Sequence, residues 1–219
     1  MENYKRNLKL LENNHIYSKE MEHDACGVGV IASTEGKKSR QIVEYGIEAL
    51  KAVWHRGAVD ADGKTGDGAG IHVEIPKDFF IEKIEVTGHD YDSAEICVAM
   101  IFLPRNDYAA QESCKTIVES ELTKNNFSIY GWRQVRVNPK ILGEKAFQTM
   151  PEIIQVLFKP NDKSLLDKNL ERKIYESRKK IENKAISLSL NNFYICSISS
   201  KSIIYKGMFL AEAISDFFL

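Results

Sequence analysis

The sequence lacks the features that mark membrane, nucleic-acid-binding or secreted proteins. No window approaches the roughly 18 consecutive apolar residues of a membrane span. The first 25 residues are charged and polar, unlike a signal peptide. The net charge of −1 at pH 7 provides no long-range attraction to nucleic acid or to anionic lipid. We therefore expect no nucleic-acid partner and no membrane partner.

Cysteines are few, and none pairs with another in a C-x-x-C motif. The four are Cys26, Cys97, Cys114 and Cys196. This scatter argues against a structural zinc site and against a disulfide framework, so we expect no bound metal and a reducing, cytoplasmic setting. Three of the four lie within apolar periodic segments, where a cysteine usually serves as a small buried hydrophobe. Cys26 is the exception.

Apolar periodicity predicts helices and strands interspersed without a strict β-α-β rhythm, which favours the α+β class. Strands are predicted at 26–32, 71–76, 95–103, 127–137, 152–158, 193–199 and 202–206. Helices are predicted at 43–54, 107–122 and 165–185, with a last one from about 208 to 219. Residues 1–25 look like a leader with little structure beyond one short helix around 8–11. The simplest division is this leader, 1–25, followed by one domain, 26–219.

Cys26 opens a predicted strand and is followed by Gly27-Val28-Gly29. A free thiol has a pKa of about 8.5, so a nucleophilic cysteine needs a base at neutral pH. If Cys26 were the first residue of the mature chain, its own α-amino group, with a pKa of about 8, could serve. That arrangement requires cleavage between Ala25 and Cys26. The alternative is a half-buried structural cysteine at the start of a strand.

Three glycine-containing motifs have structural explanations as well as functional ones. Gly27-Val28-Gly29 lacks the third glycine and the following helix of a dinucleotide site, and Gly66-Asp67-Gly68-Ala69-Gly70 lacks the Lys-Ser/Thr of a phosphate loop. The second motif is typical of a backbone that passes close to another element or to a small ligand. His55-Arg56-Gly57 ends a predicted helix, where a cation offsets the negative end of the helix.

Taken together, several blocks in order resemble the N-terminal part of the glutamate synthase large subunit. The first two are 22–29, around Cys26, and 49–71, which contains His55-Arg56-Gly57 and Thr65-Gly66-Asp67-Gly68-Ala69-Gly70. Later blocks are Gly131-Trp132-Arg133-Gln134-Val135, Asn138-Pro139, Leu142-Gly143, Pro151-Glu152-Ile153 and 202–208. The resemblance spans about 22 to 219, so it is far more specific than any one motif.

The resemblance implies an N-terminal-nucleophile hydrolase fold, an α-β-β-α sandwich, and a type-2 glutamine amidotransferase. Cys26 would attack the glutamine amide with its α-amino group as base, and Arg56 and Gly57 would border the nucleophile. The released ammonia would reach an FMN site elsewhere in the large subunit and combine with 2-oxoglutarate to give glutamate. A 3Fe-4S cluster and an NADPH-oxidising small subunit would supply the electrons. None of these cofactors is expected within this chain, because its cysteines form no cluster-binding run.

The resemblance also implies missing parts. In that family an Asn-Gly pair forms the oxyanion hole, and an arginine and an aspartate hold the substrate. Their counterparts are expected beyond Leu219, since nothing in 1–219 matches them. We therefore expect a sandwich incomplete at its C-terminal end, an inactive chain in isolation and poor solubility. Two alternatives stay open: a truncated remnant acting as a structural or interaction module, and a self-standing amide hydrolase with another substrate.

Overall fold

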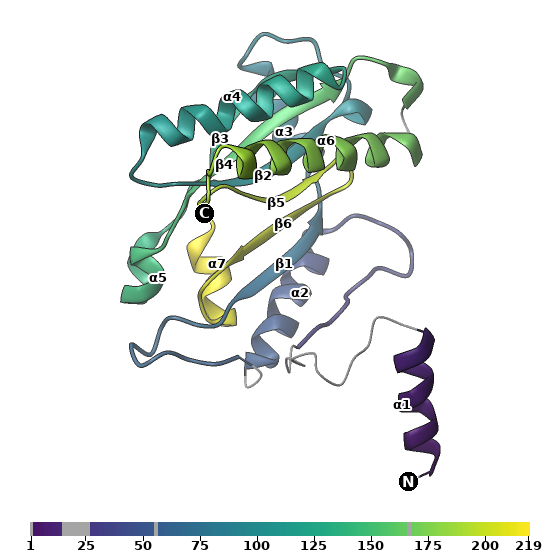
Figure 1. Cartoon of the computed structure of the whole chain (residues 1–219), viewed down its shortest axis with the longest axis vertical. Coiled ribbons are helices and arrows are strands. Elements are labelled where there is room, and N and C mark those ends of the chain that lie inside the picture. The colour runs from purple at the N-terminus through teal and green to yellow at the C-terminus, as the bar shows by residue number, and fades with distance from the viewer. Residues whose placement is uncertain (1, 15–26, 55–56, 166–167) are drawn as a thin grey trace.

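A computed structural model describes residues 2–14, 27–54, 57–165 and 168–219. Helix α1 covers Glu2–Asn14 and is longer than the short helix expected in the leader. The remaining elements mix helices with antiparallel strands (Figure 1), which confirms the α+β class. Among the described residues, no helix has the length and apolar character needed to cross a bilayer.

The centre of the molecule is a four-stranded antiparallel sheet in the order β3-β4-β2-β5. Its strands are β2 (Cys97–Leu103), β3 (Phe127–Gln134), β4 (Glu152–Pro160) and β5 (Tyr194–Ser199). Almost every residue of β2 is buried, because both faces of the sheet are covered. That double burial explains why β2 reads in the sequence as a continuous apolar run.

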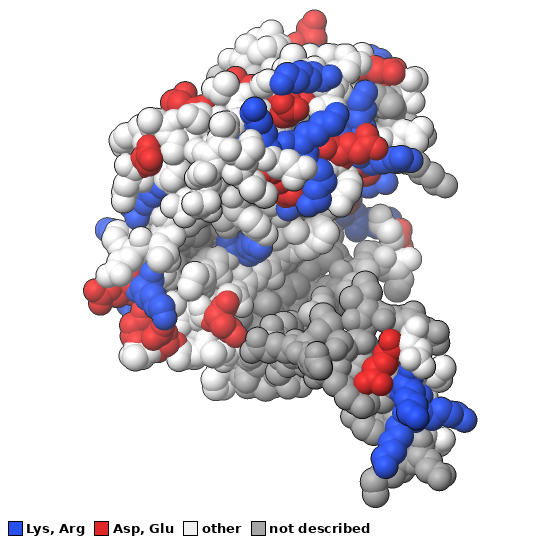
Figure 2. Space-filling model, viewed as in Figure 1, with Lys and Arg blue, Asp and Glu red and all other residues white. Residues whose placement is uncertain are grey.

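Two long helices cover one face of this sheet (Figure 1): α4 (Tyr108–Lys124) and α6 (Lys168–Ser187). Asp107 caps α4, because its carboxylate accepts a hydrogen bond from the Ala110 amide at 2.9 Å. Alternate residues of β2 and β4 pack under these helices with their predicted apolar stripes. On the face shown in Figure 2, Lys and Arg alternate with Asp and Glu over α6, which fits a solvated outer surface.

The other face of the four-stranded sheet packs against a second sheet and α3 (Lys77–Glu85). The second sheet pairs β1 (Ala69–Glu74) with β6 (Ser202–Gly207) in antiparallel fashion, from Ala69 opposite Gly207 to Glu74 opposite Ser202. Helix α2 (Arg40–Ala52) lies beside β1, where Gly46 faces Ile71. The described layers are therefore helices, sheet and sheet, and the fourth layer of the expected sandwich stays a prediction.

Two sequence predictions are wrong within the described residues, and two α-helices were missed. Residues 27–33 form no strand and are mostly exposed. The last helix does not begin at about 208, because β6 runs to Gly207 and the chain bends at Met208 and Phe209; only η5 (Ala211–Ala213) and α7 (Ile214–Phe217) follow. Helix α3 and the short α5 (Glu144–Gln148) had no clear apolar period to reveal them.

Candidate functional site

Of the three predicted site residues, one lies within the described part of the chain. Cys26 and Arg56 lie outside the described residues. Gly57 is described, and its amide donates a hydrogen bond to the carbonyl oxygen of Trp54 at 3.0 Å. A side chain at Gly57 would start 3.3 Å from Oδ1 of Asp67, so this carboxylate lies directly beside the Gly57 backbone.

Residues 57–67 fold back on themselves as a small hairpin, which we call the site hairpin. Val59 and Gly66 form an antiparallel bridge, and the Asp60 amide donates to the carbonyl oxygen of Thr65 at 2.9 Å. The Asp67 amide donates to the carbonyl oxygen of Ala58 at 3.3 Å. The base of the site hairpin therefore carries Gly57, and its tip is formed by residues 60–65.

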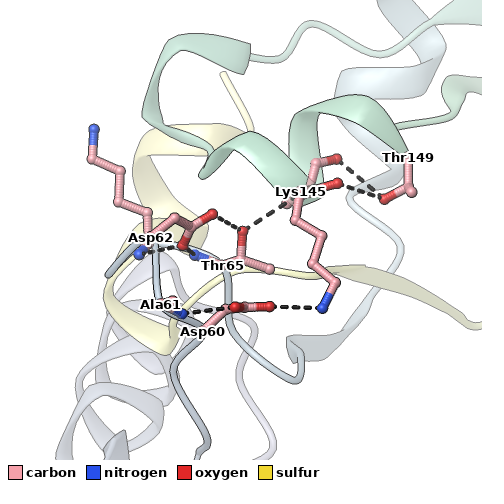
Figure 3. A network of polar contacts seen from close by, with 8 residues as sticks. Asp60, Ala61, Asp62, Thr65, Lys145 and Thr149 are labelled. Atoms are coloured by element: carbon pink, nitrogen blue, oxygen red, sulfur yellow. Dashed lines mark hydrogen bonds and ion pairs between the residues drawn. The ribbon is translucent and has the colours of Figure 1, made fainter.

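The tip is tied to the first turn of α5, a helix that begins after Gly143 and so has no capping side chain of its own (Figure 3). Thr65 supplies what Gly143 lacks, because its hydroxyl oxygen accepts a hydrogen bond from the Ala146 amide at 3.3 Å. Asp62 accepts another from the Lys145 backbone amide. Asp62 and Thr65 thus cap α5 from about 80 positions earlier in the chain, and we call this pair the trans cap.

Asp62 and Thr65 are also bonded to each other. Oδ2 of Asp62 accepts from the Thr65 hydroxyl at 2.6 Å, and Oδ1 accepts from the Thr65 amide at 2.7 Å and the Lys64 amide at 2.9 Å. These hydrogen bonds, with that of the Lys145 amide, hold the pKa of the Asp62 carboxyl far below its usual range. Thr65 is 2% exposed, so its hydroxyl has exchanged water for these partners.

An ion pair adds a second tie between the tip and α5. The Lys145 ammonium lies 2.7 Å from Oδ2 of Asp60 (Figure 3). The hydrogen bond to Lys145, with that of the Ala61 amide, lowers the pKa of Asp60, and the same ion pair raises the pKa of Lys145. Both side chains are partly solvated, so the pair orients the tip more than it stabilises the fold.

Glycines allow the surrounding backbones to come this close. A Cβ on Gly66 would lie 2.8 Å from the carbonyl oxygen of Phe209, and a Cβ on Gly70 would lie 2.8 Å from Cβ of Lys206. A Cβ on Gly143 would overlap the Asp62 carboxylate and the Thr65 hydroxyl. The structure therefore brings together three blocks that are far apart in the sequence: 57–70, Leu142-Gly143 and 202–208.

The three described cysteines are poor nucleophiles. Cys97, Cys114 and Cys196 are free thiols and all are buried, as their apolar surroundings predicted. Burial raises the pKa of Cys114 and of Cys196 to about 11, and it raises that of Cys97 further. At neutral pH these thiols hold their protons, so none of the three supplies a thiolate.

The block Gly131–Val135 lies away from the site hairpin, on β3. Arg133 reaches between the two sheets, where Nη1 donates to Oε1 of the fully buried Gln155 at 2.7 Å and the guanidinium stacks on Phe79 at 4.9 Å. This block contributes to the core, and nothing in these contacts places it at a reaction centre. A separate open cavity of about 520 Å³ lies at the ends of β2, β3 and β4, and its lining, which includes Arg105 and Arg136, contains no site-hairpin residue.

Sequence reasoning singled out the Thr65–Gly70 motif and missed its partners. One local signal was available: an aspartate three residues before a threonine is typical of a turn in which the carboxylate accepts backbone amides. No local signal links Asp60 to Lys145 or Thr65 to Ala146, because these contacts join segments about 80 residues apart. They become visible only once α5 is folded against the hairpin.

Comparison with known proteins places these features in a family. The family described as Glutamine amidotransferases class-II matches residues 26–219, so the match begins at Cys26. Glutamate synthase [NADPH] large chain from Azospirillum brasilense is 52% identical over 215 residues, which cover 98% of this chain and 14% of that protein. Ferredoxin-dependent glutamate synthase 1 from Arabidopsis thaliana is 39% identical over 200 residues, 90% of this chain and 12% of that protein.

A third relative gives a similar result. Ferredoxin-dependent glutamate synthase from Pyropia yezoensis is 36% identical over 215 residues, 96% of this chain and 14% of that protein. The chain thus spans about one seventh of the length of these curated relatives. The family match covers everything from residue 26 onward, including the site hairpin and the first turn of α5, which the hairpin caps. The chain therefore belongs to the class-II glutamine amidotransferases.

Proposed function

We propose that this chain is the glutamine-hydrolysing part of a glutamate synthase and that Cys26 is its nucleophile. The observation that carries the proposal is the family match, which starts at Cys26 and runs through the site hairpin. The high pKa values of Cys97, Cys114 and Cys196 support it, because they leave Cys26 as the thiol suited to attack at neutral pH.

The proposed reaction begins with removal of residues 1–25, which exposes the α-amino group of Cys26. That amine accepts the thiol proton, and the sulfur attacks the side-chain amide carbon of glutamine. The carbon–nitrogen bond then breaks, and ammonia leaves with the proton returned by the α-ammonium group. Water hydrolyses the resulting thioester, releasing glutamate and restoring the thiol. Arg56 and Gly57 are proposed to border this centre.

The rest of the proposed synthase lies outside this chain. The ammonia would react with 2-oxoglutarate in the remaining domains of the large subunit, with electrons from an NADPH-oxidising small subunit. The described residues contain no group of three or more His, Cys, Asp or Glu side chains that could hold a metal ion. The described residues therefore do not fit a 3Fe-4S cluster, and we assign that cluster and FMN to the other domains. We place the enzyme in the cytosol, where unpaired thiols persist.

The test is Cys26→Ser introduced at the native gene locus, with the protein purified as its own cells make it. Glutamate formation is then measured with glutamine and, separately, with added ammonia. We expect the glutamine-dependent rate to disappear and the ammonia-dependent rate to persist, because the serine hydroxyl is a much weaker nucleophile than a thiolate. Cys114→Ser is the matched control. A Cys26→Ser enzyme that still uses glutamine would refute the assignment.

Processing is tested separately by N-terminal sequencing of the same purified protein. A chain that starts at Cys26 supports the proposed base, since only then does the cysteine carry a free α-amino group. An intact N-terminus at Met1 would contradict the nucleophile's proposed activation and favour the structural or interaction module. Peptide mapping by mass spectrometry after treatment with a diazoketone analogue of glutamine would locate the reactive thiol directly.

A further inference from the structure

The site hairpin is held at its tip, whereas the residue proposed to border the nucleophile lies at its base. Within the described residues, polar contacts from other elements converge on the tip: Thr65 and Asp62 bind the α5 amides, and Asp60 binds Lys145. Backbone hydrogen bonds and the Val59–Gly66 bridge then connect the tip to Gly57 and Asp67. A shift of the tip is thus transmitted through a short, hydrogen-bonded ribbon to the base.

We propose that Thr65 and Asp62, the trans cap, are positioning residues for glutamine hydrolysis, and that the ion pair of Asp60 with Lys145 assists them. This inference rests on the proposed function, because it takes Gly57 to lie next to Cys26. Neither Thr65 nor Asp62 is proposed to touch glutamine. Their role is to fix the site hairpin against α5, so that the backbone at Gly57 keeps the geometry that attack requires.

The packing around the trans cap holds Thr65 and Asp62 in place. Thr65 is buried, and its hydroxyl sits between the Asp62 carboxylate and the Ala146 amide. Both side chains lie directly against the Gly143 backbone, since a Cβ there would overlap both. On the other side, Gly66 lies against the Phe209 backbone. The hairpin is therefore clamped between α5 and the segment that follows β6.

Removing the Thr65 hydroxyl breaks this clamp while keeping the shape of the side chain. In Thr65→Val the Asp62 oxygen and the Ala146 amide each lose a partner in a place that admits little water. The tip then gains freedom relative to α5. Because a misplacement of about 1 Å at a reacting group lowers rates by as much as about 100-fold, a smaller shift at the base predicts about a tenfold loss.

The experiment uses Thr65→Val in the protein purified from its own cells, with Thr65→Ser to restore the hydroxyl. Thr149→Val is the matched control, because Thr149 lies at the C-terminal end of α5 and its hydroxyl donates to the Lys145 carbonyl oxygen, away from the site hairpin (Figure 3). A diazoketone analogue of glutamine is the probe. The endpoint of labelling counts the folded sites, whereas the rate constant of labelling reports their geometry.

We expect Thr65→Val to label as many sites as the wild type but about ten times more slowly. The kcat with glutamine should fall while the ammonia-dependent rate stays unchanged, and Thr65→Ser should recover most of the loss. Thr149→Val should behave as wild type. A purely structural role predicts the opposite pattern: fewer labelled sites, each reacting at the normal rate.

A second variant covers the case in which Thr65→Val does not fold. Lys145→Met removes the ion pair from the tip at little cost to stability, and Lys140→Met removes an exposed nearby lysine as its control. A labelling rate for Lys145→Met about two- to threefold below that of Lys140→Met would support the inference. Equal rates for the two, or an unchanged rate in a folded Thr65→Val, would overturn it.

The two proposals fail in different ways. If Cys26→Ser abolishes use of glutamine and the tip variants change nothing, the positioning role is wrong and the proposed function stands. If Cys26→Ser keeps full glutamine-dependent activity, the proposed function is wrong, and the positioning role falls with it. Both proposals are supported if Thr65→Val is labelled slowly and Cys26→Ser has no glutamine-dependent activity.

Discussion

Two glycine motifs in this chain have similar sequences and very different surroundings. Gly27-Val28-Gly29 lies in an exposed stretch without regular structure, and no described atom comes within 4 Å of a Cβ placed on Gly29. Gly66 and Gly70, in the second motif, each face backbone or side-chain atoms of the β6 region at less than 3 Å from such a Cβ. Glycine is thus sterically required at Gly66 and Gly70, whereas nothing in the described structure requires it at Gly29.

The comparison shows how glycine acts where segments meet. At Gly66 the backbone conformation needs no positive φ, so the requirement comes from the neighbour, Phe209, and its carbonyl group. A sequence pattern cannot reveal that neighbour, because it arrives from more than 140 positions away. Close approach, and not conformational freedom, is what this glycine contributes.

The largest expected effect comes from Gly66→Ala. The added methyl group would meet the Phe209 backbone, which cannot rotate away as a side chain could, so we expect a loss of about 3 kcal/mol in the free energy of unfolding. Gly29→Ala is the matched control, with an expected change within about 0.5 kcal/mol. Urea denaturation of the 219-residue chain measures both. Similar values for the two variants would remove the proposed contrast between the motifs.

Thr65→Val should have the next largest effect on stability. The substitution leaves Oδ2 of Asp62 and the Ala146 amide without their buried partner, which costs about 1–2 kcal/mol. Thr149→Val, at an exposed position just after α5, should change the free energy of unfolding by no more than about 0.5 kcal/mol. Denaturation curves recorded side by side would decide the point. A Thr65→Val chain as stable as the control would show that water replaces the hydroxyl.

Much of the fold could be predicted from the sequence because its signals are local. The strand predicted at 95–103 and the helix predicted at 107–122 depend on neighbouring residues, and the structure confirms both as β2 and α4. The predicted helix start near Met208 was wrong because the chain bends there, with the Phe209 backbone against Gly66 and the Phe209 ring packed among Phe217 and Phe218. That competing interaction is tertiary, so no local pattern contains it.

The candidate site was less predictable than the fold. Resemblance could point to Cys26, Arg56 and Gly57, and the described structure adds geometry for Gly57 alone. The residues that hold the site hairpin, Thr65 and Lys145, act through partners about 80 positions away. Spacing rules operate within one helix, strand or turn, so they cannot detect a cap supplied by another segment.

Asp62→Asn should flatten the dependence of stability on pH. The folded-state pKa of Asp62 lies below its unfolded value of about 3.9, so its contribution is fully present above that pH. It is lost as the pH falls through the unfolded value toward the folded one. We therefore expect the wild type to be more stable than Asp62→Asn at pH 7 and the difference to shrink by pH 3. Parallel stability curves from pH 7 to 3 would contradict this assignment.

The smallest expected effect on stability is that of replacing both Val28 and Val30 with lysine. This variant tests the exposed stretch that contains the first glycine motif, Gly27-Val28-Gly29. Both side chains are more than 85% exposed, so the two substitutions remove no buried apolar surface and should change the free energy of unfolding by less than about 0.5 kcal/mol. They should raise solubility, because they interrupt an exposed apolar stretch with charge. Val98→Lys, a change at a fully buried valine of β2, is the control that should unfold the chain. Solubility is measured by the protein concentration that stays in solution after centrifugation. A large loss of stability in the Val28 and Val30 variant would mean that this stretch packs against the protein in solution, and the contrast between the two glycine motifs would then no longer hold.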